Sequence, residues 1–400
     1  MSRHLQVQKK KSMPTIHKVL IALIGVALIA LAAVIIFGIS NLDNLPGGPG
    51  PGHIDIDPDD PAMIIDPNED DERPRRPDPS PRPRPELDTG VEHYNPLTGE
   101  AMDLGKSRAR PIAVVLNNLA EALPLNGVSK ADIIYEYPVE GGLTRTLALF
   151  QDISDVQKVG SIRSARHYTV QIAHAYDAIL VAAGRSPQAQ EEVRTLNVPF
   201  LNEVEGPLRD ALFRDRNRVP GRRVENLHAV VTTGERLMLW LPEYSFRLMH
   251  EDNYEQSLSF TADAVPQNGS TANEATIRYS GARSTTFSYN QAQNAYTVRY
   301  GNNDFIDAND NSRPSFTNIL VLKTSVSLIP GDNSGRLNVN TTGSGTGYFI
   351  NGGKYIEINW TRANQSVPFT YTLSNGTPFD FGVGKTYICI VPTNQDTTFS

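Results

Sequence analysis

The charged residues best placed for chemistry lie between positions 136 and 166. Glu136 and Glu140 stand on either side of a Tyr-Pro-Val segment, two glycines follow, and Arg145 comes next. Arg163 and Arg166 are three residues apart, a spacing that predicts one shared face in the first turn of a helix. A helix N-terminus favours anions, and two guanidinium forks there suit bidentate capture of a carboxylate or a phosphate.

These residues allow three interpretations. In the first, which we favour, they form a cleft that binds an anionic envelope ligand or a partner protein without catalysis, and Asn117 is a further ligand-binding residue. In the second, the arginines pair with the two glutamates as an internal ion-pair network. In the third, Glu136 or Glu140 is the general acid or base of a cell-wall polymer hydrolase or transferase, and the arginines orient the substrate. That chemistry requires both carboxylates in one cleft, about 5–10 Å apart.

Other catalytic, metal and cofactor signatures are missing from the sequence. It contains no Gly-Lys-Ser/Thr phosphate loop, no nucleophile elbow and no His-Glu-x-x-His motif. Cys389 is the single cysteine, which excludes an intramolecular disulfide and a multi-cysteine metal site. His167 and His174 are seven residues apart, whereas a helical metal pair needs a spacing of three or four. We therefore expect neither a metal nor a cofactor.

Two patterns of regular structure position these residues and predict an α+β fold. Residues 93–250 read as a mixed α/β domain with strands at 111–118, 132–138, 143–152 and 177–183, and with helices over 162–176, 187–196 and 233–241. Residues 251–395 contain short β-branched and aromatic runs separated by turn clusters, which predict a mostly antiparallel β domain without a helix. The domain boundary is expected between 245 and 275.

The first 92 residues have a different composition. Residues 19–39 are 21 uncharged, mainly apolar residues, long enough to cross a bilayer. Residues 1–18 carry five Lys/Arg and no acid, so the positive-inside rule predicts a cytoplasmic tail and a single-pass helix in the cytoplasmic membrane, with the C-terminal domains extracytoplasmic. A cleaved signal peptide is the alternative. Residues 40–92 are rich in proline and acid, which predicts a disordered linker.

The charge distribution limits the possible partners. Residues 43–90 hold 13 acidic residues against five arginines, whereas residues 91–400 hold 27 basic and 31 acidic residues. The predicted folded part is therefore close to neutral, and we expect no nucleic-acid partner. The expected partners are the membrane, through the N-terminal helix, and a cell-wall component or membrane protein.

Several segments resemble the YerB-like family of bacterial proteins, whose two halves are catalogued as N- and C-terminal domains of unknown function. The resemblance covers roughly residues 93–393. It is carried by Asn95-Pro-Leu-Thr-Gly99, Arg110-Pro-Ile-Ala-Val-Val-Leu-Asn-Asn118, Ala131-Asp-Ile-Ile-Tyr-Glu-Tyr-Pro-Val-Glu-Gly-Gly-Leu-Thr-Arg145, Gly160-Ser-Ile-Arg-Ser-Ala-Arg166, Tyr176-Asp-Ala-Ile-Leu-Val181, Gly343-Ser-Gly-Thr-Gly-Tyr348, Ile356-Glu-Ile-Asn-Trp360 and Gly384-Lys-Thr-Tyr-Ile-Cys-Ile-Val-Pro392. It implies an envelope protein outside the cytoplasmic membrane, with an α/β half followed by a β half, and no established activity.

The chain departs from that family in two places. The family is usually lipid-anchored, but no cysteine lies next to the apolar run here, because the single cysteine is Cys389. The family also tends to show Pro-His-Asn-Leu-Tyr where this chain has Val224-Glu-Asn-Leu-His228. Glu225 cannot simply replace a histidine in chemistry, so the second departure weighs against an enzyme.

Overall fold

The computed structural model describes residues 93–202, 211–254 and 257–400. The predicted tail (1–18), membrane helix (19–39) and nearly all of the linker (40–92) lie outside these residues. Within the described ranges, no helix is both long and apolar enough to cross a bilayer. All described residues belong to one compact unit.

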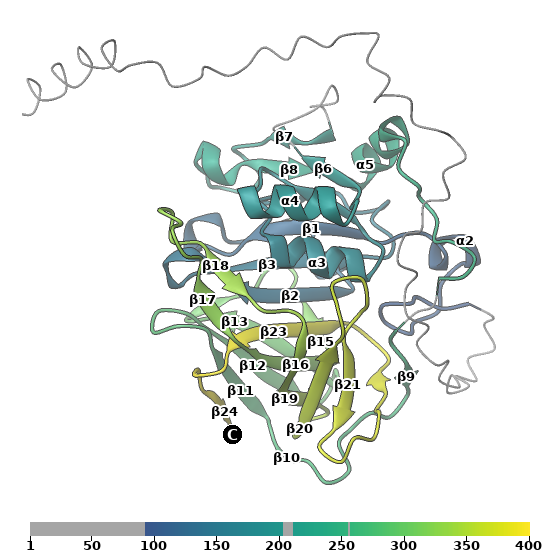
Figure 1. Cartoon of the computed structure of the whole chain (residues 1–400), viewed down its shortest axis with the longest axis vertical. Coiled ribbons are helices and arrows are strands. Elements are labelled where there is room, and N and C mark those ends of the chain that lie inside the picture. The colour runs from purple at the N-terminus through teal and green to yellow at the C-terminus, as the bar shows by residue number, and fades with distance from the viewer. Residues whose placement is uncertain (1–92, 203–210, 255–256) are drawn as a thin grey trace, which may run out of the picture. The chain divides into compact units, whose positions relative to one another are not determined.

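An 11-stranded sheet runs through the whole described part of the chain (Figure 1). Its order is β10-β20-β19-β16-β23-β2-β3-β1-β5-β6, and β21 pairs with β20. The strands are β1 (Ile112–Asn117), β2 (Ile133–Pro138), β3 (Thr144–Phe150), β5 (Ile179–Ala182), β6 (Phe200–Asn202), β10 (Ser270–Thr271), β16 (Asn318–Thr324), β19 (Gly343–Asn351), β20 (Lys354–Arg362), β21 (Thr370–Leu373) and β23 (Thr386–Pro392). Strands from both halves of the sequence therefore share one sheet.

The two halves join where β23 lies between β16 and β2. It is parallel to both, with Thr386 opposite Asn318 on one side and Ile133 on the other. The prediction of a mixed α/β half followed by a mostly antiparallel β half is confirmed in this coarse form, and the described part of 251–400 contains no helix. The predicted boundary near residue 250 stays a prediction.

A second, six-stranded sheet and three small sheets complete the β structure. The six-stranded sheet contains β11 (Glu274–Arg278), β12 (Ser284–Asn290), β13 (Ala295–Tyr300), β14 (Asn303–Asp304), β15 (Ser315–Phe316) and β24 (Thr397–Phe399). The small sheets are β4 (Val159–Gly160) with β8 (Val230–Thr232) and β7 (Phe213–Arg214), β9 (Phe260–Thr261) with β22 (Phe381–Gly382), and β17 (Val326–Leu328) with β18 (Leu337–Val339).

Four α-helices occur in the described N-terminal half: α2 (Leu104–Ser107), α3 (His167–Ala175), α4 (Pro187–Thr195) and α5 (Gly234–Trp240). Ser186 caps α4 by accepting a hydrogen bond from the Ala189 amide at 3.1 Å, and Pro187 occupies its first turn. In Figure 1, α3 and α4 lie in front of the central strands.

Alternation along the central strands divides the hydrophobic core into two layers. On β1, Val115 faces the layer that contains the α3 residues Tyr168 and Ile172, whereas Val114 faces the layer that contains Phe287 of the six-stranded sheet. Adjacent residues on these strands therefore point to opposite sides.

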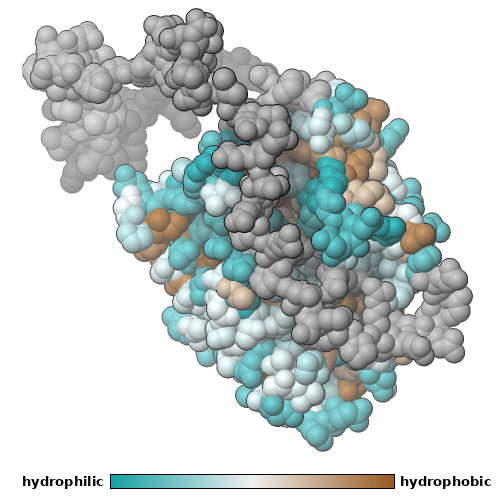
Figure 2. All heavy atoms as spheres, turned by 45° about the vertical axis from the view of Figure 1, so that its right-hand side comes forward, coloured by the Kyte–Doolittle hydropathy of each residue, from teal (hydrophilic) through white to brown (hydrophobic). Residues whose placement is uncertain are grey.

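The outer surface is mainly polar. On the face shown in Figure 2, hydrophobic residues appear in small separate groups among hydrophilic ones. The exposed large apolar side chains in the described residues are Leu104, Leu143, Leu227, Met238, Leu239, Met249 and Leu328. Isolated apolar side chains of this kind are ordinary on protein surfaces.

Candidate functional site

Most of the predicted site residues lie at one end of the central strands of the main sheet. By 'edge' we mean this end of the strands, not an outer strand. β1 runs parallel to β5, and β3 runs antiparallel to both β1 and β2, so β1, β2 and β5 all end at this edge while β3 begins there. Asn117 ends β1, Glu140 follows β2, and Arg145 is the second residue of β3. In sheets of this kind, the carboxyl ends of the strands are where ligands commonly bind.

The segment 163–166 reaches the same edge through backbone hydrogen bonds. The amide of Arg163 donates to the carbonyl of Val115 at 2.9 Å, and its carbonyl accepts from the amide of Ala183 at 3.0 Å. The segment is thus held between the ends of β1 and β5. These bonds place Arg166 in contact with Glu140, which also pairs with Arg145, and bring Arg163 near enough for its charge to act on them. We call these four residues the arginine cluster.

The prediction that both arginines occupy the first turn of a helix over 162–176 is wrong. α3 begins at His167, Arg166 is its N-cap residue, and Arg163 lies three residues earlier. The physical reason is that the backbone before α3 bonds to strands: the amide of Ile162 donates to the carbonyl of Val230 at 2.8 Å. The arginines meet because an irregular segment brings them together, and helical periodicity plays no part.

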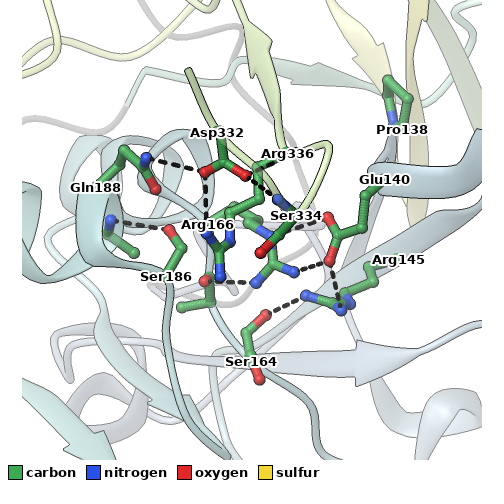
Figure 3. Close-up of polar contacts among 12 residues, drawn as sticks. Pro138, Glu140, Arg145, Ser164, Arg166, Ser186, Gln188, Asp332, Ser334 and Arg336 are labelled. Atoms are coloured by element: carbon green, nitrogen blue, oxygen red, sulfur yellow. Dashed lines mark hydrogen bonds and ion pairs between the residues drawn. The ribbon is translucent and has the colours of Figure 1, made fainter. Parts of the chain in front are cut away.

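A single carboxylate joins two of the arginines (Figure 3). Arg166 forms a fork with Glu140: its Nε donates to Oε2 at 3.2 Å, and its Nη2 contacts Oε1. Arg145 Nη2 approaches the same Oε1 at 3.5 Å, while its Nη1 donates to the carbonyl of Ser164 at 2.8 Å. The side chains of both arginines are less than a tenth exposed, and that of Glu140 is 28% exposed.

The electrostatics keep these groups charged at neutral pH. Burial alone would raise the pKa of Glu140, but hydrogen bonding and charge from Arg166, together with the charge of Arg145, lower it below its ordinary value. Burial and the neighbouring charge of Arg166 lower the pKa of Arg145 to about 10. The cluster therefore holds three positive charges and one negative charge.

Arg163 lacks an acidic partner among the described residues. It is half-buried, its Nη1 lies 3.4 Å from the carbonyl of Leu227, and its buried Nε has no hydrogen-bond partner. Burial, followed by the charge of Arg166, lowers the pKa of Arg163. A partly buried cation without a carboxylate is costly unless something else balances its charge.

The side chain of Asn117 contacts a histidine near Arg163, while its backbone lies opposite Arg145 in the pairing of β1 with β3. Its Nδ2 lies 2.9 Å from Nδ1 of His228, and its Oδ1 accepts from the amide of Leu119 at 3.2 Å. An amide Nδ2 can only donate, so this contact assigns the ring proton of neutral His228 to Nε2. Burial and then the charge of Arg163 lower the pKa of His228, which keeps the ring neutral.

Glu136 does not join the arginine cluster. It is completely buried on the opposite face of β2, where it accepts hydrogen bonds from Thr285 and Tyr387 at 2.7 and 2.8 Å. Arg283 pairs with it at 3.4 Å, and Asn118 and Thr144 also donate to it. The expectation that all the charged residues share one cleft is therefore corrected. Side chains alternate along a strand, and Glu136 shares a face with Ile134, whereas Glu140 lies beyond the end of β2.

The C-terminal half contributes residues that the sequence did not indicate as part of a site. The hairpin formed by β17 and β18 lies beside α4 and Arg166 in Figure 3. Asp332 accepts from Nε2 of Gln188 at 3.4 Å and from Arg336 at 2.9 Å, and Asn338 lies 3.0 Å from His167. The sequence marks only a turn at 330–333, because contacts across 144 and 171 residues leave no local signal.

The described residues hold no group of three or more His, Cys, Asp or Glu side chains that could bind a metal ion. Cys389 is fully buried in β23, and burial raises the pKa of its thiol, which does not suit a nucleophile. A shallow hollow of about 660 Å³ lies away from the arginine cluster, at the β12–β13 turn around Tyr289, and carries no charged side chain. Volume alone therefore does not point to the chemistry.

Comparisons with known proteins give consistent matches. Residues 97–238 match the model described as "Protein of unknown function (DUF3048) N-terminal domain", and residues 275–388 match its C-terminal counterpart. The Bacillus subtilis (strain 168) protein named "Putative lipoprotein YerB" is 30% identical over 311 residues, which cover 76% of this chain and 88% of that protein. The crystal structure of YerB from Bacillus subtilis has a TM-score of 0.65 at 26% identity and covers 77% of this chain and 100% of that one.

Proposed function

Because the chain belongs to the DUF3048 family, which is described only as a family of unknown function, we propose a function from the residues of this chain. The membership confirms the resemblance to the YerB-like family. We propose that this chain is a membrane-anchored protein whose folded part lies outside the cytoplasmic membrane. There it binds an anionic envelope ligand through the arginine cluster.

The membrane attachment rests on the apolar run at 19–39. A relative is named a lipoprotein, whereas the single cysteine of this chain is Cys389, within the folded part. A membrane-spanning helix therefore takes the place of a lipid anchor in this proposal. We expect the full chain to stay in the membrane fraction after washing with high salt and alkali and to leave it only with detergent. Recovery of a shortened soluble chain would instead show a cleaved signal peptide.

One observation supports the binding proposal most strongly: Arg145 and Arg166 share the single carboxylate of Glu140, and Arg163 lies close enough for its charge to act on the same group. Arg163 lacks an acidic partner in the described part of the chain, and Arg166 stands at the N-terminal end of α3, where the helix dipole disfavours cations. An arrangement of this kind destabilises the unliganded fold. An anionic ligand would balance the excess charge through bidentate hydrogen bonds.

The test measures binding of the full chain, in detergent micelles, to bacterial cell-wall fragments that carry their anionic polymers and to fragments stripped of them. We expect sedimentation with the intact fragments only. Arg163→Ala should weaken binding about tenfold or more, because it removes charged hydrogen bonds to the ligand.

The matched control is Arg194→Ala, which removes a 75%-exposed arginine from the surface of α4. This variant should bind as the unmodified chain does. Equal binding by Arg163→Ala and the unmodified chain would contradict the proposal. Binding that is insensitive to polymer removal would contradict it too and would favour a partner protein.

Hydrolysis or group transfer receives no support from the geometry. The two carboxylates that such chemistry needs face opposite sides of β2, and Glu136 is fully buried with both oxygens hydrogen-bonded. Glu140 is paired with arginine, and its lowered pKa makes it a poor proton donor at neutral pH.

A further inference from the structure

Glu140 occupies the position in which a ligand's anionic group would bind the arginines. Its two oxygens receive the fork of Arg166, and one of them also faces Arg145. Bidentate pairing of this type is how arginine binds carboxylate and phosphate ligands. The chain therefore supplies its own anion to two of its three clustered guanidinium groups.

The backbone around Glu140 places it at the tip of a turn. The single 3₁₀ turn Glu140–Gly142 connects β2 to β3, and its two glycines have φ values of 73° and 71°. Positive φ values are readily adopted by glycine and rarely by other residues. The carboxylate thus projects from a short exposed loop, and it is the most exposed charged group of the three that form the ion pairs.

The charge balance indicates the class of ligand. With Glu140 in place, the cluster retains an excess of two positive charges. A phosphoryl group carries up to two negative charges and three acceptor oxygens, enough to engage more than one guanidinium fork. A single carboxylate offers one charge and two oxygens, which Glu140 already supplies.

We propose that the arginine cluster takes a phosphoryl group and that the carboxylate of Glu140 competes with it for Arg166 and Arg145. This inference rests on the proposed function, since it assumes that the cluster binds an anion. Glu140 then acts as an internal competitor that weakens binding of monoanions and is displaced by a ligand of higher charge.

The test is calorimetric titration of the full chain in uncharged detergent micelles with sodium pyrophosphate, and with sodium acetate as the carboxylate comparison. We expect pyrophosphate to bind at least tenfold more tightly than acetate. Glu140→Gln keeps the shape and one acceptor oxygen of the side chain but removes its charge, so it should tighten pyrophosphate binding about tenfold.

Glu191→Gln is the matched control, because it makes the same change in the 63%-exposed carboxylate that pairs with Arg194. It should leave both affinities unchanged. If Glu140→Gln fails to fold, Glu140→Asp gives a second reading: its shorter side chain keeps the charge but reaches the guanidinium groups less well, so it should tighten binding by a smaller factor.

The outcomes separate this inference from the function on which it rests. If Arg163→Ala abolishes pyrophosphate binding while neither Glu140 variant tightens it, the competition is disproved and the binding function stands. If acetate binds as tightly as pyrophosphate, the phosphoryl assignment is disproved. If neither anion binds and wall-fragment binding is insensitive to Arg163→Ala, both proposals fail.

A final arm distinguishes the sources of the phosphoryl group. Phosphatidylcholine vesicles with and without phosphatidylglycerol are added to the chain in competition with pyrophosphate. Displacement by the phosphatidylglycerol vesicles alone supports a lipid headgroup as the source. Displacement by soluble polymers of glycerol phosphate, and not by vesicles, supports a wall polymer. If neither the vesicles nor the soluble polymers displace pyrophosphate, the proposal of a phosphoryl ligand from the envelope is contradicted.

Discussion

Glu136 and Glu140 are four residues apart, and each lies beside arginine, yet their surroundings differ in kind. Glu136 is sealed between two sheets, where hydroxyl groups, one amide and Arg283 satisfy its oxygens. Glu140 is partly exposed and meets more positive charge than it can balance. A buried carboxylate with a complete set of donors joins parts of a fold together. A partly exposed carboxylate at the strand ends that is surrounded by more positive charge than it can balance leaves positive charge available to bind an anionic ligand.

The largest effect that would test this comparison is loss of the buried carboxylate. Glu136→Ala leaves Arg283, whose side chain is only 14% exposed, without its counter-charge, so we expect a loss of about 3–5 kcal/mol in the free energy of unfolding. Chemical denaturation of the full chain, followed by fluorescence of the buried Trp360, measures it. Anion binding by the remaining folded protein should be unchanged.

Glu191→Ala serves as the control for Glu136→Ala. Its carboxylate is exposed, so its loss should leave the free energy of unfolding nearly unchanged. A cost for Glu136→Ala of less than about 1 kcal/mol would show that the buried network does not hold the two sheets together.

A smaller effect is expected in the acid dependence of stability. The pKa of Glu140 is lowered in the folded state, so its stabilising contribution is complete above its ordinary pKa and is lost as the pH falls through the lower, folded value. Glu140→Gln should therefore lower the free energy of unfolding at pH 7, and the loss should shrink to nothing at pH values below the lowered pKa, where the carboxyl of Glu140 is itself uncharged. Unfolding curves of both proteins between pH 3 and 7 measure the difference. If the difference in the free energy of unfolding between the two proteins were the same at every pH, the charge of Glu140 would contribute no net stability.

The smallest effect on stability should come from Arg163. It makes no ion pair within the described residues and its partial burial is costly, so Arg163→Ala should leave the free energy of unfolding unchanged or raise it by less than about 0.5 kcal/mol. The same variant should still lose anion binding. A loss of several kcal/mol in denaturation experiments would place Arg163 with Glu136, among residues that serve the fold.

The sequence predicted the central strands and α4 well because their signals are local. Alternation and β-branched runs located β1, β2 and β5 within two residues, and a capping serine followed by proline located the start of α4. The orientation of Glu136 was also within reach: in the run Asp-Ile-Ile-Tyr-Glu-Tyr-Pro, strict alternation puts it on the side of Ile134. The same alternation would place Glu140, four residues further on, on that side too. The two carboxylates separate because β2 ends at Pro138 and Glu140 belongs to a 3₁₀ turn, which strand periodicity does not predict.

Other features depend on distant contacts and could not be predicted locally. α3 begins five residues later than expected because β1 and β8 take up the backbone groups of Ile162 and Arg163. The β17–β18 hairpin reaches α3 and α4 across more than 140 residues. The hydroxyl of Tyr387 donates a hydrogen bond to Glu136, which lies 251 residues earlier in the sequence. No local sequence pattern predicts contacts between residues so far apart.

The position of β23 has a consequence for biogenesis. On the side that faces the second half of the molecule, β2 pairs with β23, a strand more than 240 residues further along the chain that ends at Pro392. Pairings between such remote segments form slowly, and multistranded chains with unpaired edges are prone to aggregate. The central sheet can therefore close only after residues 386–392 have been synthesised. Under the proposed location outside the cytoplasmic membrane, this late closure would leave the central sheet open while residues 93–385 are translocated.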